Sequence, residues 1–156
     1  MNALKLLKED HQKVSDLFER FEAAGEEQKK RHIYDQIASE LEAHTHIEET
    51  IFYPALQEQE ELKDMVLEAF EEHKQVKTLI REIGNLVKDS DKFDAKMTVM
   101  KENVVHHVEE EENEMFPKVE QLFDVSELEE LGKEMAAAKL QFGKQKRTAS
   151  SGGRSK

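Results

Sequence analysis

Apolar residues recur at alternating steps of three and four along most of the chain, the spacing that places them on one face of an α-helix. This pattern predicts four long amphipathic helices, at residues 2–24, 28–53, 61–88 and 91–116. Asn2 is the expected N-cap of the first helix, and Gly25 is expected to stop it. Pro54 and Pro117 are expected to end the second and fourth helices, because proline restricts the backbone of the residue before it.

A fifth, shorter helix is predicted near the C-terminus. Ser126 and Glu129 have the spacing of a capping box, and apolar residues continue at helical spacing to about residue 142. Residues 143–156 are rich in Gly, Ser, Lys and Arg and have almost no apolar side chains, so we expect a disordered basic tail. Residues 1–142 are therefore predicted to form one domain.

Polar residues interrupt the apolar stripes of all four long helices, and the interruptions repeat. The segment EDHQKVSDLFERF at 9–21 matches EEHKQVKTLIREI at 71–83, and the motif HxxxEExxxxP occurs at 44–54 and again at 107–117. Two helical hairpins with the same pattern predict an all-α fold. The expected architecture is an up-down four-helix bundle with pseudo-twofold symmetry, followed by the short C-terminal helix.

The interrupting residues are of types that bind metal ions, and they can meet at one level of the bundle. They are His11, His44, Glu48, His73, His107 and Glu111. Residues four apart, such as His44 and Glu48, lie on one helix face about 6 Å apart along the axis. Each buried ion costs several kcal/mol unless it is compensated. A metal centre is the simplest compensation for two carboxylates in this position.

The number and type of these ligands narrow the choice of metal. Six protein ligands exceed the four of a structural zinc site, so two ions bridged by the carboxylates fit better than one. Nitrogen and oxygen ligands without sulfur suit iron, manganese or zinc, and carboxylate-bridged metal pairs occur inside helix bundles. Iron is the first choice, with zinc or manganese behind it.

The ordered set of histidines and glutamates resembles the haemerythrin-like family, whose HHE domains are named after such patterns. The resemblance covers the four long helices, roughly residues 2–117, and includes residue identity, spacing, helix order and the two prolines. It implies two irons bridged by Glu48 and Glu111. It further implies that His11 and His44 bind one iron and that the two histidines of the second hairpin bind the other.

The chain departs from oxygen-carrying haemerythrins at two positions. The resemblance places a fifth histidine ligand at position 77, where this chain has Lys77, and the family's usual spacing of five selects Glu112 in place of Glu111. Four histidines leave more coordination positions open, which favours redox chemistry or sensing with peroxide, oxygen or nitric oxide over reversible oxygen carriage. Lys77 is expected to lie near the cluster and to hydrogen-bond a bound peroxide or hydroxide.

Other polar and large residues are less directly linked to metal binding. Glu49 and Glu112 are either solvated residues beside the site or partners that orient the ligands, and a role as alternative bridging ligands is also open. Three histidines outside the stripes are expected at the surface: His32, His46 and His106. Four further residues are expected to serve in packing: Tyr34, Tyr53, Met97 and Met100.

Composition excludes several classes of protein. The net charge is −12, with 35 Asp+Glu against 23 Lys+Arg, and such a surface repels nucleic acid and anionic lipid. No uncharged stretch has the length of a membrane span or the form of a signal peptide. The chain has no cysteine, which excludes disulfides and thiolate chemistry and agrees with a cytoplasmic location.

Two functional hypotheses follow from these residues. The first is a non-haem di-iron protein that binds or reacts with a small oxidant, with catalase-like or peroxidase-like activity as its enzymatic form and an electron donor as a further partner. The second is a non-catalytic module that stores or carries iron, or that uses a metal to stabilise the bundle. The number of protein ligands discriminates between them, because a structural site should be saturated by the protein. A metal-free interaction module ranks last, since it would leave six buried polar residues without partners.

Overall fold

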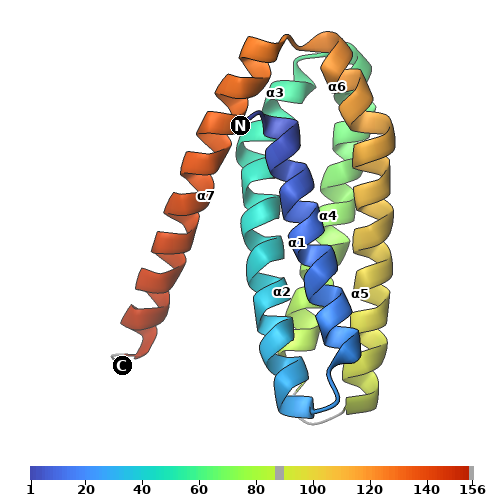
Figure 1. Cartoon of the computed structure of the whole chain (residues 1–156), viewed down its shortest axis with the longest axis vertical. Coiled ribbons are helices and arrows are strands. Elements are labelled where there is room, and N and C mark those ends of the chain that lie inside the picture. Colours follow the sequence, from blue (N-terminus) through green and yellow to red (C-terminus); the bar gives the residue numbers. More distant parts are fainter. Residues whose placement is uncertain (87–89, 155–156) are drawn as a thin grey trace.

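The computed structural model describes residues 1–86 and 90–154, and the side chains of residues 1–86 and 91–147. Four antiparallel helices form a bundle (Figure 1). They are α1 (Ala3–Ala23), α2 (Glu27–Ile47), α4 (Lys63–Gly84) and α5 (Ser90–Glu110). The described residues contain no strand, so the predicted all-α bundle is confirmed. Asn2 caps α1 as predicted, because its Oδ1 accepts a hydrogen bond from the Lys5 N–H at 2.8 Å.

Pro54 and Pro117 do not end their helices, contrary to the prediction. Each follows a π-helical turn, η1 (Glu48–Phe52) or η3 (Glu111–Met115), and the chain then continues as α3 (Tyr53–Gln57) or α6 (Phe116–Leu122). The N–H of the residue before each proline bonds to the carbonyl five residues back. Each proline thereby occupies the first turn of the next helix, where no N–H is required.

Helix α7 (Val125–Arg154) begins at a different cap from the predicted one. The Glu127 N–H donates to Asp124 Oδ1 at 2.8 Å, and the Asp124 N–H donates to Glu127 Oε1 at 3.0 Å. Asp124 and Glu127 therefore form the capping box that the sequence led us to expect at Ser126 and Glu129. Both pairs have the required spacing, and the earlier one is used.

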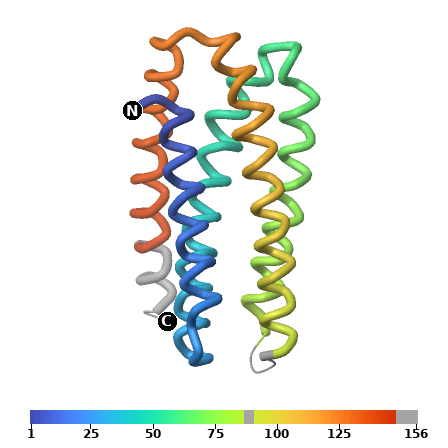
Figure 2. Tube along the Cα trace, turned by 45° about the vertical axis from the view of Figure 1, so that its right-hand side comes forward, coloured from blue at the N-terminus to red at the C-terminus, as the bar shows by residue number. Residues whose placement is uncertain are grey.

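The same helix also continues past residue 142, so the disorder expected from residue 143 does not hold for its helical part. Lys, Gln and Arg favour helix even where no apolar residue is present. Contacts with α2 hold this part of the helix: Phe142 stacks on His46 with ring centroids 4.7 Å apart, and Lys146 pairs with Glu42. Figure 2 shows α7 alongside the α1–α2 hairpin, on the side away from α4 and α5.

Buried apolar side chains form two clusters separated by a polar level. One cluster lies toward α3, α6 and the start of α7, and the other lies toward the α1–α2 and α4–α5 turns. Along α1, Leu7 belongs to the first cluster, Val14 to the second, and His11 lies between them. None of the described helices combines the length and the apolar character that crossing a bilayer requires.

Two glycines of α7 should respond in opposite ways to alanine. A Cβ on Gly132 would lie 2.1 Å from the backbone oxygen of Met1, whereas one on Gly143 would meet nothing within 4 Å. Gly132→Ala should therefore destabilise the fold by about 1–3 kcal/mol, by pushing the N-terminus off α7. Gly143→Ala should stabilise it by about 0.5–1 kcal/mol. Thermal unfolding followed by circular dichroism measures both; equal effects would contradict the packing of α7 on the N-terminus.

Candidate metal centre

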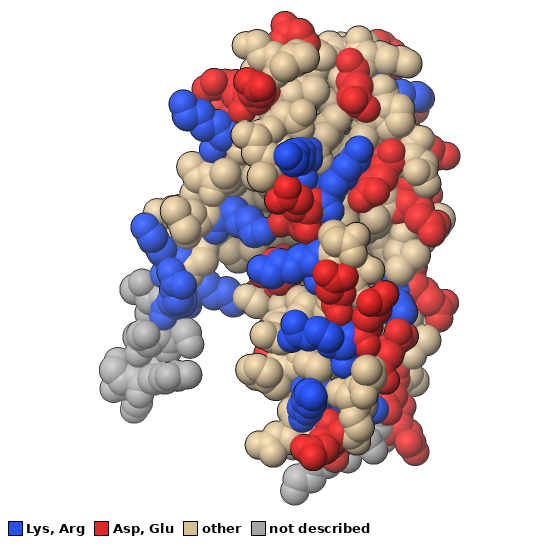
Figure 3. Space-filling model, in the orientation of Figure 1, with Lys and Arg blue, Asp and Glu red and all other residues tan. Residues whose placement is uncertain are grey.

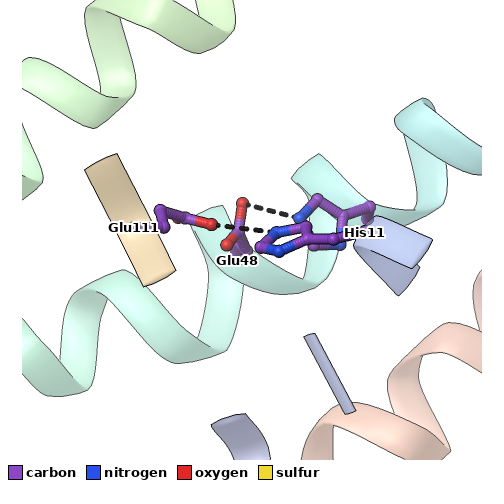
Figure 4. Close-up of side chains that lie close together, drawn as sticks. His11, Glu48 and Glu111 are labelled. Atoms are coloured by element: carbon purple, nitrogen blue, oxygen red, sulfur yellow. Dashed lines mark ion pairs between the residues drawn. The ribbon is translucent and has the colours of Figure 1, made fainter. Parts of the chain in front are cut away.

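Six side chains predicted to interrupt the helix stripes converge at one level of the bundle. None of these residues is more than 7% exposed, and each of the four bundle helices or its π turn supplies at least one: His11, His44, Glu48, His73, His107 and Glu111. In Figure 4 the carboxylates of Glu48 and Glu111 lie close together and face His11. The structure thus brings together every residue of the predicted ligand set.

The ligand atoms form two groups that share Glu48. Atoms of the first group all lie within 4.8 Å of one another, and the group consists of His11, His44, Glu48 and Glu111. The second group consists of Glu48, His73 and His107. Glu111 also reaches both histidine pairs, since its Oε1 lies 3.1 Å from His11 Nε2 and its Oε2 lies 3.3 Å from His107 Nε2. Both carboxylates therefore lie between the two pairs of imidazoles.

The unsatisfied atoms of the centre suit a bound cation. Four buried nitrogen or oxygen atoms here have no hydrogen-bond partner among the described residues: His11 Nε2, His44 Nε2, Glu48 Oε2 and Glu111 Oε1. The two nitrogens lie 3.1 and 3.2 Å from glutamate oxygens but lack hydrogen-bond geometry. Buried polar atoms are rarely left unpaired. Imidazole nitrogens and carboxylate oxygens that face one another in this way fit iron, manganese or zinc.

Each of the four histidines forms a hydrogen bond to a carboxylate through its outward-facing nitrogen, Nδ1. The Nδ1–carboxylate pairs are His11–Glu112 (2.6 Å), His44–Asp10 (3.0 Å), His73–Glu49 (2.7 Å) and His107–Glu72 (2.7 Å). Each carboxylate accepts a hydrogen bond from Nδ1–H, which leaves the unprotonated Nε2 free to point inward as a ligand. The pairs obey the pseudo-twofold symmetry of the repeat.

The sequence identified two of these outer carboxylates and missed the other two. Glu49 and Glu112 were candidates for orienting partners, and the structure places both on histidines. Glu112 lies outside the group of ligand atoms, whereas Glu111 points into it. The glutamate four residues after His107, Glu111, is therefore the one that belongs to the centre. The sequence does contain an indication of Asp10 and Glu72, because each stands directly before a histidine in the repeated segment.

Lys77 does not reach the centre, contrary to the expectation from its position on the stripe. Its Nζ donates to Glu49 Oε1 at 2.8 Å, and about half of its side chain is exposed. It therefore acts on His73 only through Glu49. Lys139 of α7 pairs with a different outer carboxylate, Asp10, which is the partner of His44.

Tyr53, which was expected to pack in the core, has its hydroxyl inside the centre. The side chain is fully buried, and Oη donates to Glu111 Oε2 and to Glu48 Oε1, the latter at 3.2 Å. Oη also lies 3.2 Å from His73 Nε2 and 3.3 Å from His107 Nε2. The π turn explains the error: its extra residue rotates Tyr53 onto the face of Glu48. The equivalent residue of the other half is Phe116, which stacks on His11.

Two of the three histidines expected at the surface lie there: His32 is exposed, and His106 has 67% of its side chain exposed. His46 is instead half-buried, because Phe142 of α7 stacks on it. Met97 and Met100 are buried in the core, and the Tyr34 hydroxyl donates to the Ile80 carbonyl at 2.6 Å.

The buried charges shift one another's pKa values. Burial would raise the pKa of Glu48, but His44, His107 and His73 hold it well below its usual range. Burial would lower the pKa of His44, but Glu48 and Asp10 raise it to about 10. Without a bound cation, a proton on His44 therefore offsets part of the charge of the carboxylates at neutral pH.

The family to which the chain belongs follows from a match over most of its length. Residues 2–119 match the Hemerythrin HHE cation binding domain, and this range includes all four bundle helices. The chain is a member of this family, and its bundle is a metal-binding helical domain.

Relatives and a solved structure agree with this assignment. The protein Rv2633c of Mycobacterium tuberculosis is 28% identical over 139 residues, which are 88% of this chain and 84% of that protein. A crystal structure of the Rv2633c homologue from Mycobacterium kansasii, a Hemerythrin HHE cation binding domain-containing protein, has a TM-score of 0.78 at 28% identity, covering 91% of this chain and 87% of the other. A DNA nickase of Nostoc sp. is 27% identical over 89% of this chain, which spans only 39% of that protein.

The pKa values predict how the metal-free protein responds to pH. The pKa of His44 rises on folding, so its stabilising effect is complete below about pH 6.5 and is lost as the pH rises towards 10. The pKa of Glu48 falls, so its effect is lost as the pH drops below about 4.5. After chelation, the melting temperature should therefore be highest between about pH 4.5 and 6.5. Metal-loaded protein should show the opposite trend above pH 6.5, because ligands must lose protons to bind.

The outer carboxylates predict a graded effect on metal affinity. Glu49→Gln weakens the acceptor on His73 and should reduce metal affinity about 10–100-fold. Lys77→Met leaves that hydrogen bond in place and should change affinity much less. Competition titration with a chromophoric chelator measures both variants. A larger effect for Lys77→Met would mean that the lysine acts on the centre directly.

Proposed function

We propose that this chain is a non-haem di-iron protein that binds and reacts with a small oxidant, and that its reaction is the dismutation of hydrogen peroxide. The observation that carries the proposal is the ligand set itself: four inward imidazoles and two shared carboxylates, all buried, with unsatisfied atoms facing one another. Glu48 belongs to both groups of ligand atoms, which supports a carboxylate-bridged pair.

The count of ligands supports a reactive centre over a structural one. If two ions are bound, two histidines and the two shared glutamates would hold each of them with about four protein atoms, which is fewer than the ligands that iron commonly takes. A structural site would be saturated by the protein. Reversible oxygen carriage is disfavoured, because Lys77 replaces the fifth histidine and pairs with Glu49.

A small cavity adjoins the ring of histidines and limits the size of the ligand. It has a volume of about 30 Å³ and is lined by all four ligand histidines and by apolar residues that include Val14, Val76 and Val104. A space of this size holds one or two molecules as small as water, oxygen, nitric oxide or peroxide. A larger organic substrate does not fit.

Tyr53 supplies a proton next to the site of reaction. Iron, when bound, would supply the exchange of electrons between its ferrous and ferric states. Dismutation takes two electrons and two protons from one hydrogen peroxide and gives them to another, forming one oxygen and two waters. The Tyr53 Oη–H, hydrogen-bonded to Glu111, can hold and return one such proton. Burial and the neighbouring glutamates raise its pKa well above the usual value, so it remains a donor at neutral pH in the metal-free state.

A non-catalytic iron-binding module is the second candidate. The full burial of both glutamates and the fixed orientation of all four histidines favour tight retention of metal, as storage or carriage would need. The activity named for the Nostoc relative, DNA nicking, does not suit this chain, because a net charge of −12 repels DNA. An external electron donor would be required only if the reaction is peroxide reduction instead of dismutation.

Metal content and peroxide response test the proposal directly. Protein purified aerobically should contain about two irons per chain with near-ultraviolet absorption, and should release oxygen from peroxide as measured with an oxygen electrode. Tyr53→Phe should lower the rate about 10–100-fold while iron content stays constant, because it removes only the proton donor. One zinc per chain with a featureless spectrum would contradict the di-iron proposal. Iron without oxygen release would favour storage.

A further inference from the structure

A second cavity leads from the surface to the metal centre through acidic residues. It has a volume of about 50 Å³ and lies between α4 and the α5–η3 helix, in the hairpin remote from α7 (Figure 2). Four glutamates line its outer part: Glu68, Glu72, Glu110 and Glu114. His107 and Glu111 of the metal centre line its inner end, and none of the lining residues is Lys or Arg. In Figure 3, acidic side chains follow the edge of the molecule over α5.

The burial of these carboxylates increases along the cavity. Glu68 and Glu114 are exposed, Glu72 and Glu110 are half-buried, and Glu111 is 1% exposed. Glu111 Oε1 has no hydrogen-bond partner among the described residues. That oxygen faces His11, on the far side of the carboxylate from His107. The acidic path thus ends at a buried carboxylate of the metal centre, which distinguishes it from an ordinary solvated face.

A third group of potential ligands includes two of the glutamates that line this cavity, together with His106 at the surface. Atoms of Glu72, His106 and Glu110 lie within 4.8 Å of one another. His106 Nε2 is 2.9 Å from Glu110 Oε1 and 3.9 Å from Glu72 Oε2, while Glu72 Oε1 accepts a hydrogen bond from His107 Nδ1. Glu72 therefore connects this outer group to a ligand of the centre.

The other half of the repeat provides an internal comparison. With the offsets that align His11 with His73 and His44 with His107, the positions of Glu68, Glu110 and Glu114 correspond to Leu6, Ile47 and Ile51. Those apolar residues belong to the cluster that also contains Leu128 and Met135 of α7, so that face of the bundle is closed. The two halves of the repeat therefore differ at these positions. The first half has apolar side chains that close this face, and the second half has carboxylates around a cavity.

We propose that this cavity is the route by which divalent iron reaches the metal centre. Glu68 and Glu114 attract the cation from solvent, and the group of Glu72, His106 and Glu110 holds it before the centre takes it up. The inference rests on the proposed metal centre and adds the side of the bundle from which the metal enters it. The apolar cavity beside the four histidines then remains for the uncharged oxidant.

Metal uptake kinetics test the route with a matched control. Chelator-treated full-length protein is mixed with cobalt(II) in a stopped-flow instrument, and uptake is followed by the visible absorption of the bound ion. Glu68→Gln combined with Glu114→Gln should slow uptake several-fold at low salt, with the difference shrinking at high salt. Final stoichiometry and spectrum should equal those of the wild type. Glu71→Gln with Glu109→Gln is the control, because these exposed residues stand on the same helices but do not line the cavity.

The outcomes separate this inference from the proposed function. Uptake by Glu68→Gln/Glu114→Gln that is as fast as in the control overturns the route, even if the iron-loaded protein consumes peroxide. Slowed uptake with unchanged stoichiometry supports the route, even if peroxide is not consumed. A wild type that takes up no cobalt overturns both.

Discussion

Two glutamates, Glu48 and Glu111, lie side by side in the middle of an otherwise apolar core, and the rest of the structure follows from the need to compensate them. Four imidazoles surround them, four further carboxylates orient these imidazoles, and lysines or solvent face the outermost layer. Each layer reduces the cost of burying the one inside it. Apolar clusters on both sides keep water away, which strengthens every interaction within the polar level.

The two π turns adapt the helices to this centre. Both begin at a buried glutamate and end two residues before the proline, so each half of the repeat has the same local distortion. The extra residue brings the side chain five positions after the glutamate onto the same face. In one half that side chain is Tyr53, whose hydroxyl enters the centre, and in the other it is Phe116, which packs on His11. A symmetric backbone thus carries an asymmetric pair of side chains.

The helices and the six central residues could be predicted from the sequence, because both depend on a period of 3.6 residues that spacing reveals directly. Asp10 and Glu72 were missed because they act across helices, and single-helix patterns do not show which helices touch. The role of Tyr53 was missed because an α-helical period does not bring it onto the same face as Glu48, whereas the π turn does. The helical extension of α7 was missed because it depends on tertiary contacts with α2.

The attachment of α7 to one hairpin makes the two histidine pairs chemically different. Behind His44 stands Asp10 with the ammonium of Lys139, whereas behind His107 stands Glu72 with a second carboxylate and an exposed imidazole. The inner rings are nearly identical, but the electric field across them is not. Two ions of the same element, if bound here, would therefore occupy inequivalent places and form a polarised pair in spite of the duplicated sequence pattern.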